Sequence, residues 1–272
     1  MIQEIAPKVL DNTYRPMHPE AEDPVLCYDG EAVAVRRDGM EHLTFPMRRE
    51  FSASDTHFRY LFSIDEDHYY LYDGEKPEGM PQELVRMLRQ REDRDKCMAA
   101  ATGFHLYSWY RDHKFCGRCG APLVHDERMR MLRCPSCGME HYPVIAPAII
   151  VAVYDRDRLL LTKYTGRAYK LYALIAGFTE IGETPEETVK REVLEEVGLT
   201  VDHIRYWGSQ PWGVDQNLLL GYTAQLAGPD RVRIDEEELA VAEWFRREEI
   251  PIGDDYISLT RAMVESFKKG EF

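Results

Sequence analysis

The length and charge of this 272-residue chain narrow the classes of protein to which it can belong. The length corresponds to about two domains and is ample for a large buried core. Hydrophobic residues make up 44% and charged residues 30% of the chain, as in ordinary water-soluble proteins. The net charge of −14 excludes a global basic field that would steer the chain onto nucleic acid.

No segment has the pattern of a membrane span or of a secretory leader. The longest mainly apolar run, residues 144–154, contains Pro147 and is too short to cross a bilayer. Residues 1–10 lack a basic region followed by an apolar stretch. We therefore expect a cytoplasmic protein with no membrane partner.

Residues 1–98 are expected to form a β-rich N-terminal domain. Short alternating apolar segments recur between residues 25 and 71, and turns of the Asp-Gly type separate them. Residues 81–94 then have the pattern of a helix. Its apolar side would carry Leu84, Val85, Met87 and Leu88.

Residues 99–143 are expected to form a helix followed by a small zinc ribbon. The helical segment spans about residues 95–113, and two cysteine pairs follow it with fourteen residues between them. The paired ligands are Cys116, Cys119, Cys134 and Cys137. Two such glycine-rich turns typically supply four thiolates to a structural Zn²⁺. The alternatives are disulfides or a redox dithiol, but disulfides need an oxidising compartment and nothing in the sequence indicates one.

Residues 144–272 are expected to form the catalytic domain, beginning with a strand, a turn and a strand over residues 149–164. The run GFTEIGETPEETVKREVLEEVGL then contains a helix with readable ends. Thr184 is a good N-cap, Pro185 suits the first helical position, and Glu187 completes a capping box. Gly198 is a natural helix stop. The predicted buried stripe consists of Val189, Val193 and Val197.

Three glutamates share another face of this predicted helix. Glu192, Glu195 and Glu196 stand at positions i, i+3 and i+4, so their carboxylates repel one another unless a cation binds. Carboxylate oxygens suit Mg²⁺ or Mn²⁺, which are commonly held together with substrate phosphates. The alternative is a solvated acidic face, which is the usual outcome for charge runs.

This run resembles the Nudix box, G-x5-E-x7-R-E-U-x-E-E-x-G-U, in which U is aliphatic. The matching positions are Gly177, Glu183, Arg191, Glu192, Val193, Glu195, Glu196, Gly198 and Leu199. The resemblance implies an α/β/α sandwich with a mixed sheet and a hydrolase of nucleoside diphosphate derivatives. It also implies that the three glutamates are catalytic and that Arg191 orients a box carboxylate. Metal ligation is implied for Glu192 and Glu196 and for the backbone carbonyl of Ala176.

A second signature follows the box at Ser209, where the sequence reads SQPWGVDQN. Together with the ribbon, it resembles the NADH pyrophosphatase subfamily, whose run is SQPWPFPxS. Gly213, Val214, Asp215 and Asn217 stand where that run has Pro, Phe, Pro and Ser. Val214 cannot stack on a ring, and Asp215 adds negative charge where an anionic substrate should lie. The resemblance implies substrate contacts by Tyr142, Phe178, Gln210, Pro211, Trp212, Gly213, Val214, Asp215, Gln216 and Asn217.

One more metal ligand is expected in the acidic run at residues 235–238. The family places a glutamate six residues before a tryptophan, and Trp244 then selects Glu238, with Glu237 as the alternative. The implied reaction is hydrolysis of the pyrophosphate bond of NADH or NAD⁺ to AMP and nicotinamide mononucleotide, assisted by Mg²⁺ or Mn²⁺. NAD-capped RNA is a further implied substrate.

Two other functions are kept open by the sequence. The first is a Nudix hydrolase for ADP-ribose, FAD or a dinucleoside polyphosphate, because the SQPW run is altered. The second is a non-catalytic nucleic-acid-binding protein that uses basic ribbon residues such as Arg118 and Arg128, although the intact box argues against it. The subfamily resemblance further implies a homodimer.

Overall fold

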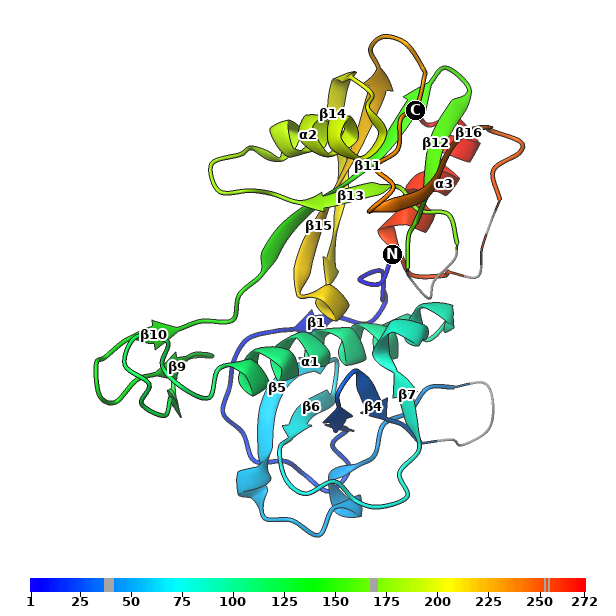
Figure 1. The fold of residues 1–272 in the computed structure, drawn as a ribbon. Coiled ribbons are helices and arrows are strands. Elements are labelled where there is room, and N and C mark those ends of the chain that lie inside the picture. The colour runs from blue at the N-terminus through cyan, green and yellow to red at the C-terminus, as the bar shows by residue number, and fades with distance from the viewer. Residues whose placement is uncertain (37–41, 167–170, 252, 254) are drawn as a thin grey trace. The chain divides into compact units, whose positions relative to one another are not determined.

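The structure is a computed structural model that describes residues 1–36, 42–166, 171–251, 253 and 255–272. It divides into two compact units. The catalytic unit comprises Met1 and residues 146–211 and 217–272, and the N-terminal unit comprises residues 2–145 and 212–216. Figure 1 traces the chain through both units, which are described separately.

The N-terminal unit is β-rich, as predicted, within the residues that the structure describes. One sheet has the strand order β1-β5-β6-β2, and a second has the order β3-β4-β7. The strands are β1 (Leu10–Asp11), β2 (Val25–Leu26), β3 (Tyr28–Asp29), β4 (Ala32–Ala34), β5 (Phe58–Ile64), β6 (Asp67–Tyr72) and β7 (Gln82–Leu84). Two short 3-10 helices, η1 (Arg48–Glu50) and η2 (Asp55–His57), precede β5. Aromatic side chains dominate the core, with Tyr70 fully buried and Phe58 and Tyr72 packed against each other.

The helix predicted at residues 81–94 is wrong. This stretch instead forms β7 and the 3-10 helix η3 (Val85–Gln90). The edge of β4 is available for pairing, and β7 pairs with it antiparallel, with Leu84 opposite Ala32. Val85 and Leu88 are buried, but Leu84 is half exposed, so the apolar residues do not form one helical stripe. Pairing with a distant strand has overridden the local helical pattern.

Helix α1 (Arg94–Asp112) agrees with the second predicted helix and leads into the zinc ribbon (Figure 1). The ribbon strands are β8 (Val124–His125), β9 (Leu132–Arg133) and β10 (Glu140–His141), in the order β10-β9-β8. Arg130 of the ribbon donates hydrogen bonds to Asn12 Oδ1 at 2.8 Å and to the Leu61 carbonyl. These hydrogen bonds tie the ribbon to strand β5, through Leu61, and to the residue that directly follows β1, Asn12.

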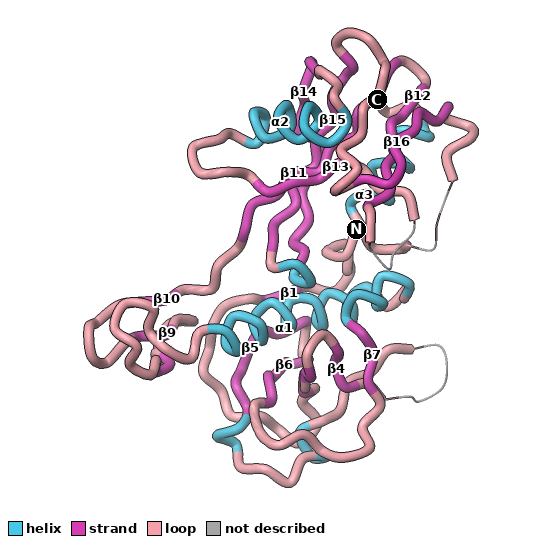
Figure 2. The backbone as a smooth tube through the Cα atoms, in the orientation of Figure 1, coloured by secondary structure: helices cyan, strands magenta, loops and turns pink. Residues whose placement is uncertain are grey.

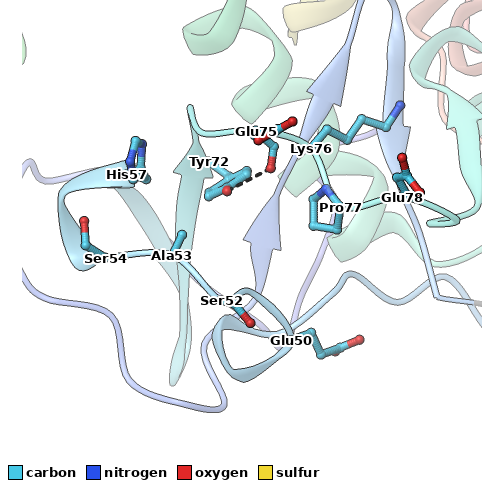
Figure 3. A pocket seen from close by; sticks show the side chains of 10 residues that line it. All are labelled: Glu50, Ser52, Ala53, Ser54, His57, Tyr72, Glu75, Lys76, Pro77 and Glu78. Carbon is cyan, nitrogen blue, oxygen red and sulfur yellow. Dashed lines mark hydrogen bonds between the residues drawn. The ribbon is translucent and has the colours of Figure 1, made fainter.

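A surface cavity of about 690 Å³ lies in the N-terminal unit, between η1 and the loop after β6 (Figure 3). Tyr72 lines it and donates a hydrogen bond to the Glu75 carbonyl at 3.0 Å. The other lining residues are Glu50, Ser52, Ala53, Ser54, His57, Lys76, Pro77 and Glu78. None of the predicted site residues lines this cavity.

The catalytic unit is built on a six-stranded mixed sheet of order β14-β15-β11-β12-β16, with β13 also paired to β11. The strands are β11 (Ala146–Asp155), β12 (Arg158–Tyr164), β13 (Ile175–Phe178), β14 (Val201–Trp212), β15 (Asn217–Leu226) and β16 (Leu239–Arg246). Strand β11 is parallel to β15 and antiparallel to β12 and β13. The strand-turn-strand prediction for residues 149–164 is confirmed.

Two helices cover the sheet, one on each face (Figure 2). Alternate residues of β11 point to opposite sides, because side chains alternate along a strand. Ile149 packs with Val193 of α2 (Pro185–Val197). Ile150 packs with Phe267 of α3 (Leu259–Lys269). The predicted α/β/α sandwich is therefore confirmed.

Within the described residues, no helix has the length and apolar character needed to cross a membrane.

Candidate active site and zinc centre

Helix α2 begins and ends where its local sequence predicts. The Thr184 side chain accepts a hydrogen bond from the backbone N–H of Glu187, and Glu187 reaches back to the backbone N–H of Thr184. Gly198 closes the helix in the left-handed conformation, with φ of 68°. The three valines of the predicted stripe are fully buried. Both ends of the glutamate-bearing helix are therefore fixed by residues within a few positions of it.

Arg191 is the centre of an ion-pair network that joins α2 to the loop before it. Its Nε donates to Glu183 Oε1 at 2.7 Å, and its Nη1 donates to Glu192 Oε1 at 2.8 Å. The same guanidinium reaches Glu195 and the carbonyl of Phe178, both at 3.0 Å. One planar cation thus holds three carboxylates and the end of β13 in a fixed arrangement.

Glu183 is the partner in this network that the sequence left without a role. The hydrogen bond from Arg191 lowers the pKa of Glu183 to about 2, and further bonds from the Glu180 N–H and Thr188 contribute. The sequence did contain a signal for this role, because Glu183 occupies a defined position of the box. Glu183 therefore holds the arginine that in turn holds Glu192 and Glu195.

The lowered pKa predicts a pH-dependent contribution of Glu183 to stability. The folded-state value of about 2 lies below the unfolded value of about 4.3, so the contribution is complete above the unfolded value. It is lost as the pH falls towards about 2. We expect the difference in unfolding free energy between wild type and Glu183→Gln to be constant above about pH 5.

Urea unfolding measured from pH 2 to 7 checks this expectation. Glu180→Gln is the matched control, because Glu180 is an exposed carboxylate on the same loop. The free energy of unfolding of wild type minus that of Glu183→Gln should shrink as the pH falls. A difference that instead grows would contradict the assigned ion pair.

Two of the three clustered glutamates are buried. Glu192 is 9% exposed and Glu196 is 2% exposed, whereas the Glu195 side chain is 58% exposed. Burial raises the pKa of Glu192, and repulsion from Glu195 and Glu238 adds to the shift. The face is therefore not the solvated acidic surface that charge runs usually form.

Gly177 brings the Glu192 carboxylate against β13. A Cβ at position 177 would lie less than 3.0 Å from the carboxylate of Glu192, so only glycine allows the two to meet. The neighbouring Ala176, whose carbonyl was predicted as a ligand, pairs with Ile150 in the centre of the sheet. The box glycine thus sets the distance between strand and helix at the site.

The acidic run before β16 approaches the same helix. The backbone N–H of Asp235 donates to the Glu196 carbonyl at 2.9 Å. The charge of Glu238 is among the causes that raise the pKa of Glu192, so this carboxylate acts on the same site.

The chemistry of this donor set suits a divalent cation, although among the described residues it is the four ribbon cysteines, and not the glutamates, that gather three or more ligand atoms into one group. Buried carboxylates that repel one another are costly unless positive charge is supplied, and hard oxygen donors suit Mg²⁺ or Mn²⁺. Arg191 supplies one positive charge to three carboxylates, which leaves the group negative. Glu192, Glu196 and Glu238 are the residues that would hold the cation.

The four ribbon cysteines form a compact thiolate cluster. Their sulfur atoms all lie within 4.8 Å of one another, with Cys116 to Cys137 at 3.6 Å and Cys119 to Cys134 at 3.5 Å. A hydrogen bond from His141 lowers the pKa of Cys116 to about 7, and backbone N–H donors lower that of Cys134 to about 6, whereas desolvation and the neighbouring sulfur atoms raise the pKa of Cys137 to about 11. Four thiolates at this spacing fit a structural Zn²⁺. Nothing in the sequence had indicated the hydrogen bond from His141 to Cys116.

Zinc removal is expected to loosen more than the ribbon. Because Arg130 holds Asn12 and Leu61, unfolding of the ribbon should also release the segment at residues 10–14. We expect chelation or Cys119→Ser to speed amide exchange in both regions, as measured by hydrogen–deuterium exchange. Ser136→Ala, a non-ligand in the second cysteine turn, is the control. Protection of residues 10–14 that survives zinc loss would contradict the coupling.

The predicted substrate-contacting residues lie in several environments. Phe178 is 53% exposed and Tyr142 is 49% exposed, so both rings are accessible. Gln210 is fully buried, and neither atom of its side-chain amide has a hydrogen-bond partner among the described residues. Pro211 is exposed and Asn217 is buried. The segment at residues 212–216 belongs to the N-terminal unit.

Comparison with known proteins decides the family. The NUDIX domain family matches residues 144–263, and the family described as NADH pyrophosphatase zinc ribbon domain matches residues 111–142. The chain is 39% identical over 180 residues to a protein of Klebsiella pneumoniae (strain 342) named NAD-capped RNA hydrolase NudC. That match covers 65% of this chain and 70% of the relative. The chain belongs to the Nudix hydrolase family.

The zinc ribbon match places this Nudix hydrolase in the NADH pyrophosphatase subfamily. A protein of Salmonella schwarzengrund with the same name as the Klebsiella relative is 38% identical, with the same coverage of 65% and 70%. The crystal structure of a NUDIX hydrolase from Nitrosomonas europaea superposes with a TM-score of 0.51 at 24% identity. It covers 58% of this chain and 92% of that chain, and the likeness concerns the fold. The protein is therefore an enzyme, a Nudix pyrophosphohydrolase with a four-cysteine ribbon.

Proposed function

We propose that this enzyme hydrolyses the pyrophosphate bond of NAD-type dinucleotides, yielding AMP and nicotinamide mononucleotide. The observation that carries the proposal is the pair of buried glutamates on α2, held by Arg191, in a chain that also carries the four-cysteine ribbon. The relatives from Klebsiella pneumoniae and Salmonella schwarzengrund are named NAD-capped RNA hydrolase NudC. NAD at the 5′ end of RNA is therefore included as a substrate.

Each residue of the network has a defined part in the proposed reaction. Glu192, Glu196 and Glu238, with the Ala176 carbonyl, would bind Mg²⁺ or Mn²⁺. The bound cation supplies positive charge that offsets the charge developing on the phosphate oxygens and polarises the attacking water. Arg191 orients Glu192 and Glu195 through its hydrogen bonds. Preorganised groups of this kind need no rearrangement as the bond breaks.

Glu195 is suited to exchange protons with water. Its side chain is the most exposed of the three, and its hydrogen bond to Arg191 fixes its direction. A carboxylate in contact with solvent can accept a proton from an attacking water and release it afterwards. Glu192 and Glu196 are buried and are better suited to hold a cation.

The predicted substrate contacts at Tyr142, Phe178 and Gln210 are retained in this proposal. The exposed ring of Phe178 directly follows the box glycine and is available for stacking. A buried amide without partners, as at Gln210, is a group that a ligand or an ordered water would satisfy.

Product analysis of NADH incubated with the zinc-loaded enzyme tests the proposal. We expect AMP and reduced nicotinamide mononucleotide in the presence of Mn²⁺ or Mg²⁺ and no products in EDTA. RNA with a 5′ NAD should be converted to RNA with a 5′ monophosphate. A folded, zinc-loaded enzyme that leaves both substrates intact would overturn the proposal.

A second candidate substrate class is favoured by the composition of residues 213–217. They are Gly, Val, Asp, Gln and Asn, so this connection offers no aromatic ring beyond Trp212. ADP-ribose, FAD and dinucleoside polyphosphates share the diphosphate linkage without requiring recognition of nicotinamide. A turnover panel with these compounds and NADH would rank them by kcat/KM.

We further propose that the enzyme is a cytoplasmic homodimer. The proposal rests on its likeness to the subfamily, with the described helices containing no membrane span. Light scattering after size exclusion should give twice the chain mass of 31.7 kDa. A mass equal to one chain at micromolar concentration would contradict it.

A further inference from the structure

The connection between β14 and β15 is the part of the catalytic domain sequence that belongs to the N-terminal unit. Residues 212–216 contain the short helix η4 (Gly213–Asp215), which contacts α1 (Figure 1). Gly213 approaches the backbone of α1 so closely that a Cβ there would lie less than 3.0 Å from the Ala101 carbonyl oxygen. A glycine at this position therefore permits the connection to lie directly on the helix.

Trp212 is enclosed at this contact. It is 5% exposed, and the guanidinium carbon of Arg89 in η3 lies 5.2 Å from its ring centroid. Its indole N–H donates a hydrogen bond to Asp215 Oδ2 at 2.9 Å. A buried indole N–H needs such an acceptor, so Asp215 supplies a specific polar partner and not merely a surface charge.

Asp215 also contacts η3 within the same unit. Its Oδ1 accepts a hydrogen bond from Arg86 Nη2 of η3 at 3.4 Å. The negative charge at position 215 is thus opposed by a cation, and the ring at position 212 is covered by another. Both cations come from η3, which pairing of β7 with β4 places beside α1.

We propose that residues 212–216 are a docking element bound by η3 and α1, and that Asp215 is the positioning residue that fixes Trp212 within it. Trp212 is then engaged inside the protein, and the connection presents no free aromatic face to a substrate. This inference rests on the proposed function and narrows its substrate contacts. The second ring of a dinucleotide has no aromatic partner on this connection, and the exposed ring of Phe178 is the one that stays available for stacking.

The register of the catalytic sheet explains why this anchoring matters for the reaction. Asn217, the first residue of β15, lies opposite Ala146, and Phe178 at the start of the box lies opposite Ala148 on the same strand β11. The first residue after the connection and the start of the box therefore pair with positions of β11 that are only two residues apart. Loosening it should change substrate affinity more than the chemical step.

The test compares Asp215→Leu with Asp215→Asn in the full-length, zinc-loaded enzyme. Leucine is similar in size but removes the acceptor for the indole N–H, whereas asparagine keeps an oxygen there. Asp202→Leu is the control, because Asp202 is exposed at the opposite end of β14. Amide exchange of residues 212–216 is measured together with kcat and KM for NADH and ADP-ribose.

We expect Asp215→Leu to speed exchange of residues 212–216 at least tenfold and to raise KM several-fold, with kcat within twofold of wild type. Asp202→Leu should match wild type, and Asp215→Asn should lie closer to wild type than Asp215→Leu does, because it keeps an acceptor for the indole N–H but loses the ion pair with Arg86.

Several results would overturn the docking element. They are unchanged exchange in Asp215→Leu, faster exchange throughout the N-terminal unit, or an asparagine variant that behaves like the leucine one. If NADH and ADP-ribose are both left intact, the proposed function fails, and the exchange data still decide the docking element.

Discussion

Replacing Glu196 by glutamine is expected to lower kcat by about a thousandfold or more while leaving the enzyme folded. Cation-assisted stabilisation of a transition state is worth several kcal/mol, and each ~1.4 kcal/mol corresponds to a factor of ten in rate. Glu196 is 2% exposed, so its carboxylate is largely shielded from water and its charge acts strongly on a nearby cation. Glutamine has the same shape but lacks the negative charge.

The same substitution should not destabilise the fold. A buried carboxylate is disfavoured by loss of hydration, and the neutral amide relieves that cost. We expect the melting temperature of Glu196→Gln without added divalent cation to equal or exceed that of wild type. Stabilisation by Mn²⁺ should be reduced in the variant, because a cation that binds only the folded state raises its stability.

Metal-dependent turnover of NADH and thermal melts with and without Mn²⁺ check these outcomes. Glu236→Gln, in the exposed acidic run, is the charge-matched control. Full activity in Glu196→Gln would remove this residue from the cation site. Lost activity with a lowered melting temperature would instead indicate a structural role.

Gly177→Ala is expected to lower kcat/KM by about a hundredfold or more. The added Cβ would overlap the Glu192 carboxylate, which must then move away from β13. A displacement of about 1 Å at a catalytic group can cost about a hundredfold in rate. The backbone at position 177 is in an extended strand and not in the left-handed region, so alanine introduces a steric change alone.

Gly208→Ala provides the matched control, because a Cβ added there meets nothing within 4 Å. Both variants place alanine in a strand of the same sheet. Steady-state kinetics at several Mn²⁺ concentrations should show that Gly177→Ala needs more Mn²⁺ than wild type does. Gly208→Ala should need the same concentration as wild type. Equal, wild-type kinetics in the two variants would show that the Glu192 carboxylate need not lie against β13.

The sequence alone determined the parts of the protein that depend on near neighbours. The boundaries of α2 follow from Thr184, Glu187 and Gly198, whose hydrogen bonds and backbone conformation act within one helical turn. The cysteine pairs follow from their spacing, because two tight turns suffice to place four sulfur atoms together. The strand, turn and strand at residues 149–164 follow from two apolar runs separated by a short polar turn, as β11 and β12 confirm.

The tertiary structure decided the parts that depend on distant partners. Residues 81–94 carry a helical pattern, yet the free edge of β4 makes β7 a strand. Glu192 and Glu196 lie on the same helix as the more exposed Glu195, and contact with β13 and the chain before β16 determines which of them are buried. Trp212 and Asp215 follow a recognisable signature, but their contacts with η3 and α1 arise from residues more than 100 positions away. Burial and charge compensation come from chain segments that meet only after folding, so local sequence cannot specify them.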